Sequence, residues 1–294
     1  MVKCGSNGKA HAGRNLPAGS RIPKLHMFYI LLRQWLLTPV THFRLFRNFT
    51  RQEFFGQFTA SIGGWLWLLL SPIVHIIIYA FVFSYIFQVR APEEFGQTRF
   101  VVFMMIGYLP WFAFAEALTK STGLLLEKSP LITKVKFPVQ VLPVVGTAVP
   151  YLTHAIGFGI LLIYLATQGF FSVAWLLIPI IFTLQFIFTM GLVAVMSALC
   201  VFLRDLQQIV LLSVTTWFFL TPIIYPISMI HDEGIRELFL LNPMHSFVNL
   251  YREILLVGEF SPIHLYIVIP TALTSYCAGG WLFLRIKHAF GDVL

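Results

Sequence analysis

Aromatic residues are the ones in this chain whose type and spacing could bind a ligand. They make up 16% of its 294 residues. Two apolar runs hold the sets Trp65, Trp67, Tyr79, Phe83, Tyr85 and Trp217, Phe218, Phe219, Tyr225. A flat ring can stack on the apolar face of a sugar and still let the sugar slide, so these rings could line a pathway. Trp and Tyr also concentrate at the headgroup level of membranes, and both interpretations stay open.

Residues in the patterns that enzymes use are missing from this sequence. Its 294 residues contain no phosphate-binding loop, no Gly-x-Ser-x-Gly motif and no dense cluster of His, Cys or carboxylate side chains. Three scattered cysteines suit neither a disulfide framework nor a metal site. His75 and His154 lie in apolar runs, and packed, hydrogen-bonded histidines are favoured over metal ligands. We therefore expect a conduit or a scaffold rather than an enzyme, with no cofactor or metal bound by this chain.

Membrane-spanning helices are the elements that must position the aromatic residues. Long stretches without Asp, Glu, Lys or Arg, a hydrophobic content of 58% and a mean hydropathy of +0.82 are typical of a multi-pass membrane protein. The longest stretch divides at Gln168-Gly169, a polar pair with a helix-breaking glycine. We predict an all-α membrane protein with six transmembrane helices, at about 62–88, 100–119, 140–167, 174–202, 208–228 and 265–284.

Positive charge is distributed unequally between the loops, and this bias sets the orientation of a membrane protein. Sixteen of the 20 Lys and Arg lie before the first span or in the loops that share its side. The opposite loops carry only Arg90, Arg99, Arg236 and Arg252. Both termini are therefore predicted to be cytoplasmic, with 229–264 outside. The same bias explains the net charge of +8 through contact with the lipid bilayer, without nucleic acid as a partner.

The segment before the first span has two parts. Residues 1–26 are rich in Gly, Ser and Lys, which predicts a flexible cytoplasmic tail. Residues 27–60 are expected to be cytoplasmic or interfacial, because 41–60 mixes phenylalanines with arginines in a pattern that suits a helix in the headgroup plane. Some phenylalanines lie off the apolar face, so this helix could also pack against neighbouring helices. The remaining chain, 61–294, is expected to form the transmembrane domain.

A cytoplasmic loop at 120–138 combines charges with apolar residues between two prolines. Leu131, Ile132, Val135 and Phe137 would have no use in a loop that only orients the protein, which favours a docking site for another protein. The alternative is that these side chains dip into the bilayer.

Breaks in the helical pattern mark the long loop between the fifth and sixth spans. The residues at these breaks are Pro222, Pro226, Asn242 and Pro243. Segments 235–241 and 246–257 are too short to cross a membrane, which predicts re-entrant or interfacial helices. Broken backbone at membrane depth is tolerated where it is buried or lines a cavity, so this loop is a candidate for the outer mouth of a pathway.

Motifs in order along the chain resemble those of the integral-membrane permeases of two-component ABC exporters for polysaccharides, which serve O-antigen, capsule and teichoic-acid export. The resemblance covers about 41–290. Its motifs are Arg47 and Arg51, Gly63-Gly64-Trp65-Leu66-Trp67 with Pro72, Phe81-Val82-Phe83, Gly107-Tyr108-Leu109-Pro110-Trp111, Lys134-Val135-Lys136-Phe137-Pro138, Arg204-Asp205-Leu206, Pro222 with Tyr225-Pro226, and Asn242-Pro243. Each motif is weak alone, whereas the ordered set is fairly specific.

The resemblance implies half of a transporter in the bacterial inner membrane, a homodimer that binds two copies of a separate ATPase subunit carrying ATP and Mg. It also implies that the first and fifth spans line a channel at the dimer interface through the nine aromatic residues named above. The loop at 229–264 would form an outer gate with Pro222, Pro226, Asn242 and Pro243. Contacts with the ATPase are expected from Arg47, Arg51, Lys128, Lys134, Lys136 and Phe137.

Three functions are compatible with these features. The first is export of a lipid-linked polysaccharide, O-antigen-like or capsular, driven by the separate ATPase. The second keeps the exporter and replaces the cargo by a drug, a lipid or another small amphiphile. The third is an ATP-independent channel or a membrane scaffold. The preference for the first rests mostly on the family resemblance.

Overall fold

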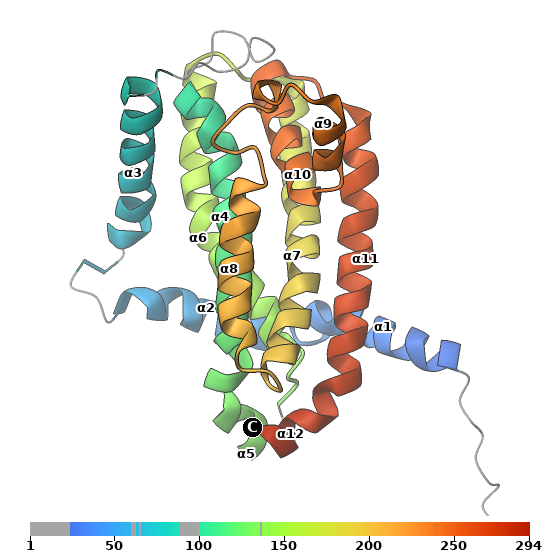
Figure 1. The fold of residues 1–294 in the computed structure, drawn as a ribbon. Coiled ribbons are helices and arrows are strands. Elements are labelled where there is room, and N and C mark those ends of the chain that lie inside the picture. Colours follow the sequence, from blue (N-terminus) through green and yellow to red (C-terminus); the bar gives the residue numbers. More distant parts are fainter. Residues whose placement is uncertain (1–23, 60–62, 65, 87, 89–99, 136) are drawn as a thin grey trace, which may run out of the picture.

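A computed structural model of the chain describes residues 24–59, 63–64, 66–86, 88, 100–135 and 137–294, and every regular element in these residues is a helix (Figure 1). The longer helices are α1 (Lys24–Thr41), α2 (Phe43–Thr59), α3 (Leu66–Ala80), α4 (Phe100–Glu127), α6 (Val141–Thr167), α7 (Ile178–Cys200), α8 (Leu206–Phe219) and α11 (Pro262–Ile286). The shorter ones are α5 (Ser129–Lys134), α9 (Glu233–Leu240), α10 (Pro243–Arg252) and α12 (Phe290–Val293). The predicted all-α fold is therefore confirmed.

All six predicted spans coincide with helices, but the helices differ in length. Four are long and apolar enough to cross a membrane, namely α4, α6 and the continuous units Val173–Cys200 and Pro262–Val293. α3 continues into a π-helix, Phe81–Ile86, and α8 has only 14 residues. α8 stops at Phe219, short of the predicted end at 228, because Pro222 and Pro226 lack the backbone N–H that helix continuation needs. The described residues thus contain four candidate spans by length and composition.

Small residues let α7 pack closely along α11 inside the bundle. A methyl group added to Gly191 would lie 2.3 Å from the backbone of Ser275, and one added to Gly279 would lie 2.1 Å from the carbonyl oxygen of Gly191. The Ser275 hydroxyl donates a hydrogen bond of 2.9 Å to the carbonyl oxygen of Phe188. Glycine and serine at a helix interface are typical of membrane proteins, where van der Waals contact must replace the hydrophobic effect.

α1 and α2 run across the lower part of the bundle rather than along it (Figure 1). Trp35 fixes α1, because its fully buried ring lies 5.8 Å from the rings of both Tyr276 and Phe283 in α11. The same ring fills the space beside Gly280. The bundle therefore holds α1 in one place.

α2 corresponds to the helix predicted at 41–60 and confirms it. Its arginines, Arg44 among them, are exposed, whereas Phe49 and Phe54 pack against Val145 and Val149 of α6. The second interpretation of the phenylalanine pattern, packing against neighbouring helices, thus applies to part of this helix. Of the predicted tail, residues 1–23 lie outside the described residues.

The loop between α8 and α11 contains two short helices, α9 and α10, near the predicted segments 235–241 and 246–257. The side chain of Asp232 caps α9 by accepting a hydrogen bond of 3.0 Å from the backbone N–H of Ile235. α10 packs among α4, α7 and α11, and Met244, Phe247 and Tyr251 are fully buried. This short helix therefore lies inside the bundle.

Candidate functional site

An aromatic cavity of about 730 Å³ lies between α3, α4, α6 and α8. The rings that line it are Phe58, Trp67, Tyr79, Tyr108, Trp111, Phe112, Phe218 and Phe219. Four of these were predicted as channel-lining residues, two from the first predicted span and two from the fifth. The structure therefore brings these two sets together around one space, which we call the aromatic cavity.

Ring contacts connect the walls of the aromatic cavity. Tyr79 of α3 lies edge-on to Tyr108 of α4 at 5.4 Å between ring centres. Tyr108 stacks on Phe112 at 4.1 Å, and Phe112 meets Phe218 of α8 at 6.1 Å. These distances are usual for stabilising aromatic pairs. The rings thus hold one another in place before any ligand arrives.

The contribution of α4 to this lining was not predicted from the sequence. Tyr108 and Trp111 belong to a motif that marked the family resemblance, but the part of α4 that carries them is apolar on all sides. In such a helix no polar stripe indicates which face points to a cavity. The available signals were the concentration of aromatic residues at 108–114 and the charged residues Glu116 and Lys120, one helical turn apart, directly after it.

A carboxylate, a lysine and a histidine lie together in the wall of the aromatic cavity. The Glu116 carboxylate lies 2.8 Å from Nε2 of His154 and 2.6 Å from Nζ of Lys120. His154 was predicted to be a hydrogen-bonded packed histidine, which this contact confirms. Ionisable groups on apolar helices are costly unless paired, and they often mark a transport pathway. Here the carboxylate joins α4 to α6.

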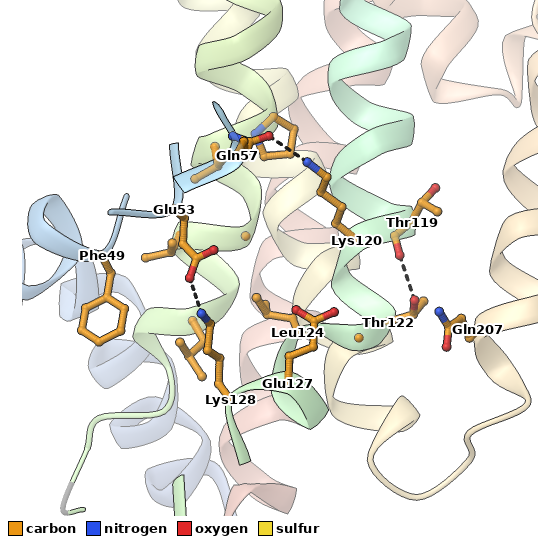
Figure 2. A pocket seen from close by; sticks show the side chains of 16 residues that line it. Phe49, Glu53, Gln57, Thr119, Lys120, Thr122, Leu124, Glu127, Lys128 and Gln207 are labelled. Atoms are coloured by element: carbon orange, nitrogen blue, oxygen red, sulfur yellow. Dashed lines mark hydrogen bonds and ion pairs between the residues drawn. The ribbon is translucent and has the colours of Figure 1, made fainter. Parts of the chain in front are cut away.

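A second space, the polar pocket, has a volume of about 400 Å³ and lies between α2, α4 and α6 (Figure 2). Lys128 forms an ion pair with Glu53 of α2, and Nζ of Lys120 donates a hydrogen bond of 3.0 Å to the Gln57 side chain. Lys120 and Thr119 line both this pocket and the aromatic cavity. The two spaces therefore adjoin, with a polar chamber beside an aromatic one.

One of the predicted outer-gate residues, Asn242, is the centre of a hydrogen-bonded cluster. Asn242 accepts a hydrogen bond of 2.8 Å from the indole N–H of Trp217 and one of 3.1 Å from the backbone N–H of Met244. Its side-chain amide donates to the hydroxyl of Thr221 at 2.9 Å. Pro243 occupies the first turn of α10, where the missing N–H is harmless. Asn242 thus caps α10 and fastens it to the end of α8.

Arg252 is a structural residue that the sequence analysis placed among the outer-loop charges without a role. Its side chain is buried and donates hydrogen bonds to three backbone carbonyl oxygens, those of Phe103 at 3.3 Å, Pro222 at 2.7 Å and Ile223 at 3.0 Å. One arginine within the apolar segment 246–257 was a signal, because charges in apolar segments are usually functional. Its partners are distant in sequence and could not be predicted.

The other predicted channel residues lie outside the aromatic cavity or beyond the described residues. Phe83 packs between Tyr79 and Phe100, and Tyr85 is 75% exposed. Trp217 points to Asn242 instead. The hydroxyl of Tyr225 donates to the carbonyl oxygen of Phe219 at 2.8 Å. Trp65 lies outside the described residues.

The residues predicted to contact an ATPase fall into two groups. Arg47, Arg51 and Lys134 are exposed, whereas Lys128 is paired with Glu53 and Phe137 packs against Phe49 at 5.2 Å between ring centres. Lys136 lies outside the described residues. α5, the helix before Phe137, also contacts α12 at the C-terminus. The contact with an ATPase stays a prediction.

Known proteins resemble this chain over most of its length. The model of the family described as ABC-2 type transporter matches residues 44–256. The O-antigen export system permease protein RfbA of Myxococcus xanthus is 32% identical over 210 residues, 70% of this chain and 78% of that protein. A Klebsiella pneumoniae protein of the same name is 28% identical over 83% of this chain and 93% of its own length. The polysialic acid transport protein KpsM of Escherichia coli is 24% identical over 70% and 78%.

The family match includes the motifs on which the sequence resemblance rested and nearly all residues of the two adjoining spaces. It also covers the end of α8 and the cap of α10. The chain therefore belongs to the ABC-2 type transporter family.

Proposed function

We propose that this chain is the permease subunit of an ABC exporter that moves a lipid-linked polysaccharide, O-antigen-like or capsular, across the bacterial inner membrane. A separate ATPase subunit, which holds ATP and Mg, drives the transport. The aromatic cavity is the observation that carries this proposal, because it combines stacking surfaces with a few hydrogen-bonding groups. Relatives named for O-antigen export and polysialic acid transport support the choice of a glycan.

The proposed exporter contains two copies of this chain. The outer faces of α3 and α8, on either side of the aromatic cavity, expose large apolar side chains, such as Ile77 and Ile78 of α3 and Ile209 and Leu212 of α8. Two copies that meet along these faces enclose the aromatic cavities in one pathway. Exposed apolar faces on both sides of the cavity support this arrangement, since they can pack either against lipid or against a second copy.

Six crossings with both termini in the cytoplasm are part of the same proposal. α8, with its 14 residues, is about 21 Å long and falls short of the roughly 30 Å of a hydrocarbon core. Buried Thr221, Pro222, Ile223 and Pro226 continue the chain beyond it, and α10 fills the outer half of the bundle. Buried irregular backbone of this kind is acceptable at membrane depth. The excess of Lys and Arg on one side supports the orientation.

The ATPase is proposed to dock beneath α2 and α5. Arg47, Arg51 and Lys134 are exposed there, and Phe137 links the α5 loop to α2 through Phe49. Movement imposed on α5 would reach α2 through this contact and the Lys128–Glu53 ion pair. Phe49, Glu53 and Lys128 of these contacts line the polar pocket. Docking would therefore act on the cytoplasmic side of the pathway.

Deletion of the gene in its source organism tests the proposal. We expect the surface polysaccharide to disappear while the lipid-linked glycan accumulates in the inner membrane. Wild-type protein restores export, and Phe112→Ala restores it several-fold less well, because it removes a ring that connects two walls of the cavity. Tyr266→Ala is the matched control, since this ring is 78% exposed on α11 and away from the cavity.

Different outcomes would contradict the proposal. Unchanged surface glycan combined with a new sensitivity to amphiphilic drugs would favour the small-amphiphile exporter. If no ATPase, or less than an equimolar amount of one, co-purifies with the chain from native membranes, a channel or scaffold would be favoured. If Phe112→Ala complements the deletion as well as the wild type does, the aromatic cavity is not part of the export pathway.

A further inference from the structure

A third space lies apart from the aromatic cavity and the polar pocket, where α1 meets the beginning of α6. This space, the α1 cavity, measures about 450 Å³ and lies on one face of the second half of α1. It is lined by Arg33, Gln34, Leu37, Thr38, Thr41, His42 and Gln140. The proposed export function uses none of these residues.

Gln140 is a buried polar side chain without a partner in this cavity. It occupies the N-cap position of α6 but makes no capping hydrogen bond, and it forms no side-chain hydrogen bond with any described residue. Only 6% of its surface is exposed. Its amide is not among the described side-chain atoms that are sealed from solvent without a partner, so it reaches the open space of the cavity. A bound ligand with hydrogen-bond acceptors would satisfy it.

The charges around the α1 cavity favour an anion. Arg33 is always protonated, and no carboxylate is among the described residues that line the cavity. The positive end of the α6 dipole also points to this region. Its first amides cannot bind the anion, because Val141 and Leu142 already donate to the carbonyl oxygens of Pro138 and Val139, at 2.9 and 3.0 Å. The donors must therefore come from side chains. Thr38 already donates to the carbonyl oxygen of Gln34, so the cavity offers Arg33 as its charged donor and Gln140 as its buried one.

The position of α1 indicates where the anion comes from. α1 lies across the bundle axis near one end of the long helices (Figure 1). Beside the cavity it exposes Leu36 and Leu37, and Val40 is 75% exposed. Such apolar side chains next to a basic cavity suit a lipid, whose acyl chains would contact the leucines while its phosphate enters the cavity. A free anion would gain nothing from the apolar residues.

We infer that the α1 cavity binds the phosphate of an anionic phospholipid from the cytoplasmic leaflet, through Arg33 and Gln140. Trp35, on another face of α1, holds this helix against α11, so the two donors stand on fixed elements. The bound lipid would join α1 to the start of α6 and set the depth of α1 in the membrane. This site does not depend on the nature of the exported cargo.

Lipid binding to the purified, delipidated full chain tests the inference, with native mass spectrometry as the readout. The probe is dioctanoyl phosphatidylglycerol. We expect Arg33→Gln to raise its Kd roughly tenfold, as for loss of a hydrogen bond to a charged group. Gln140→Met, which keeps the length of the side chain and removes its donor, should raise the Kd about threefold or more.

Arg44→Gln is the matched control, because Arg44 is also an exposed arginine, on the following helix α2, but does not line the cavity. Equal weakening by Arg33→Gln and Arg44→Gln would mean general charge attraction and would overturn the inference. Dioctanoylglycerol that binds as tightly as the phosphatidylglycerol would exclude phosphate recognition. Inorganic phosphate that displaces the lipid at equal concentration would assign the cavity to a free anion and overturn the lipid assignment.

Discussion

The guanidinium carbon of Arg252 lies 3.6 Å from the centre of the Phe103 ring. This contact joins α10 to α4, and the hydrogen bonds from Arg252 to Pro222 and Ile223 add the chain that follows α8. A desolvated cation on an aromatic face contributes about 2 kcal/mol. One buried side chain therefore fastens three segments of the bundle, namely α4, α10 and the chain that follows α8.

Replacing Arg252 by lysine tests this arrangement. Lysine keeps the charge but cannot present two or three donors in one plane to separate carbonyl oxygens. We expect the free energy of unfolding to fall by roughly 2–4 kcal/mol, since buried acceptors lose their partners. Denaturant unfolding of the purified protein in one detergent measures the change. Arg204→Lys, at an exposed position, should change it by less than about 0.5 kcal/mol. Similar values for both variants would show that the contacts of Arg252 add no stability.

Close packing of α7 on α11 gives a second prediction. In Gly191→Ala the new methyl group would meet the Ser275 backbone, which cannot move aside as a side chain can. The two helices must separate, at a cost above the usual 1–3 kcal/mol of overpacking. We expect little folded protein in detergent, measured by size-exclusion chromatography. Gly159→Ala in α6 meets no atom within 4 Å and should fold as well as the wild type or better. A well-folded Gly191→Ala protein would contradict the backbone contact.

The helices were predictable from the sequence because the length of the charge-free stretches determines them. A stretch without charges that is long enough for the bilayer forms a helix, and the breaks at Gln168-Gly169 and Asn242-Pro243 end one. The amphipathic pattern also predicted α2. The predicted end of α8, at 228, lies beyond the observed end at Phe219. Pro222 was noted, but a run of apolar residues continues past it to 230.

Side-chain partners could not be predicted in the same way. Arg252 binds carbonyl groups 29, 30 and 149 residues away, and no periodic pattern encodes such contacts. Trp217 belonged to the predicted channel set, yet its N–H donates to Asn242. In apolar helices the difference between lining a cavity and packing in the core depends on a small rotation, and this rotation is set by neighbouring helices.

A buried hydrogen-bond chain connects α10, α7 and α4. The hydroxyl of Tyr251 donates to the Gln185 side chain at 2.9 Å, and the Gln185 amide donates to the carbonyl oxygen of Pro110 at 2.8 Å. Tyr251→Phe should lower the free energy of unfolding by about 1 kcal/mol, since hydrogen bonds inside membrane proteins average about that or less. A double-mutant cycle with Gln185→Leu measures the coupling. A coupling of zero would show that the two side chains act independently.

Lys134 and Phe137 allow docking to be separated from folding. Lys134 is exposed, whereas Phe137 is partly buried against Phe49. Phe137→Ala should therefore lower the free energy of unfolding by about 1–3 kcal/mol. A loss of docking in this variant would then not be separable from a loss of stability. Lys134→Glu should leave stability unchanged and lower export roughly tenfold or more, because like charges at an interface cost several kcal/mol.

The measurement for Lys134→Glu is co-purification of the ATPase together with surface polysaccharide. Arg285→Glu, an exposed charge reversal at the end of α11, is the control and should keep both. If Lys134→Glu also keeps both, α5 does not contact the ATPase through this residue. If it loses export but still binds the ATPase, α5 transmits movement rather than holding the subunit, which would leave Arg47 and Arg51 of α2 as the anchoring contacts.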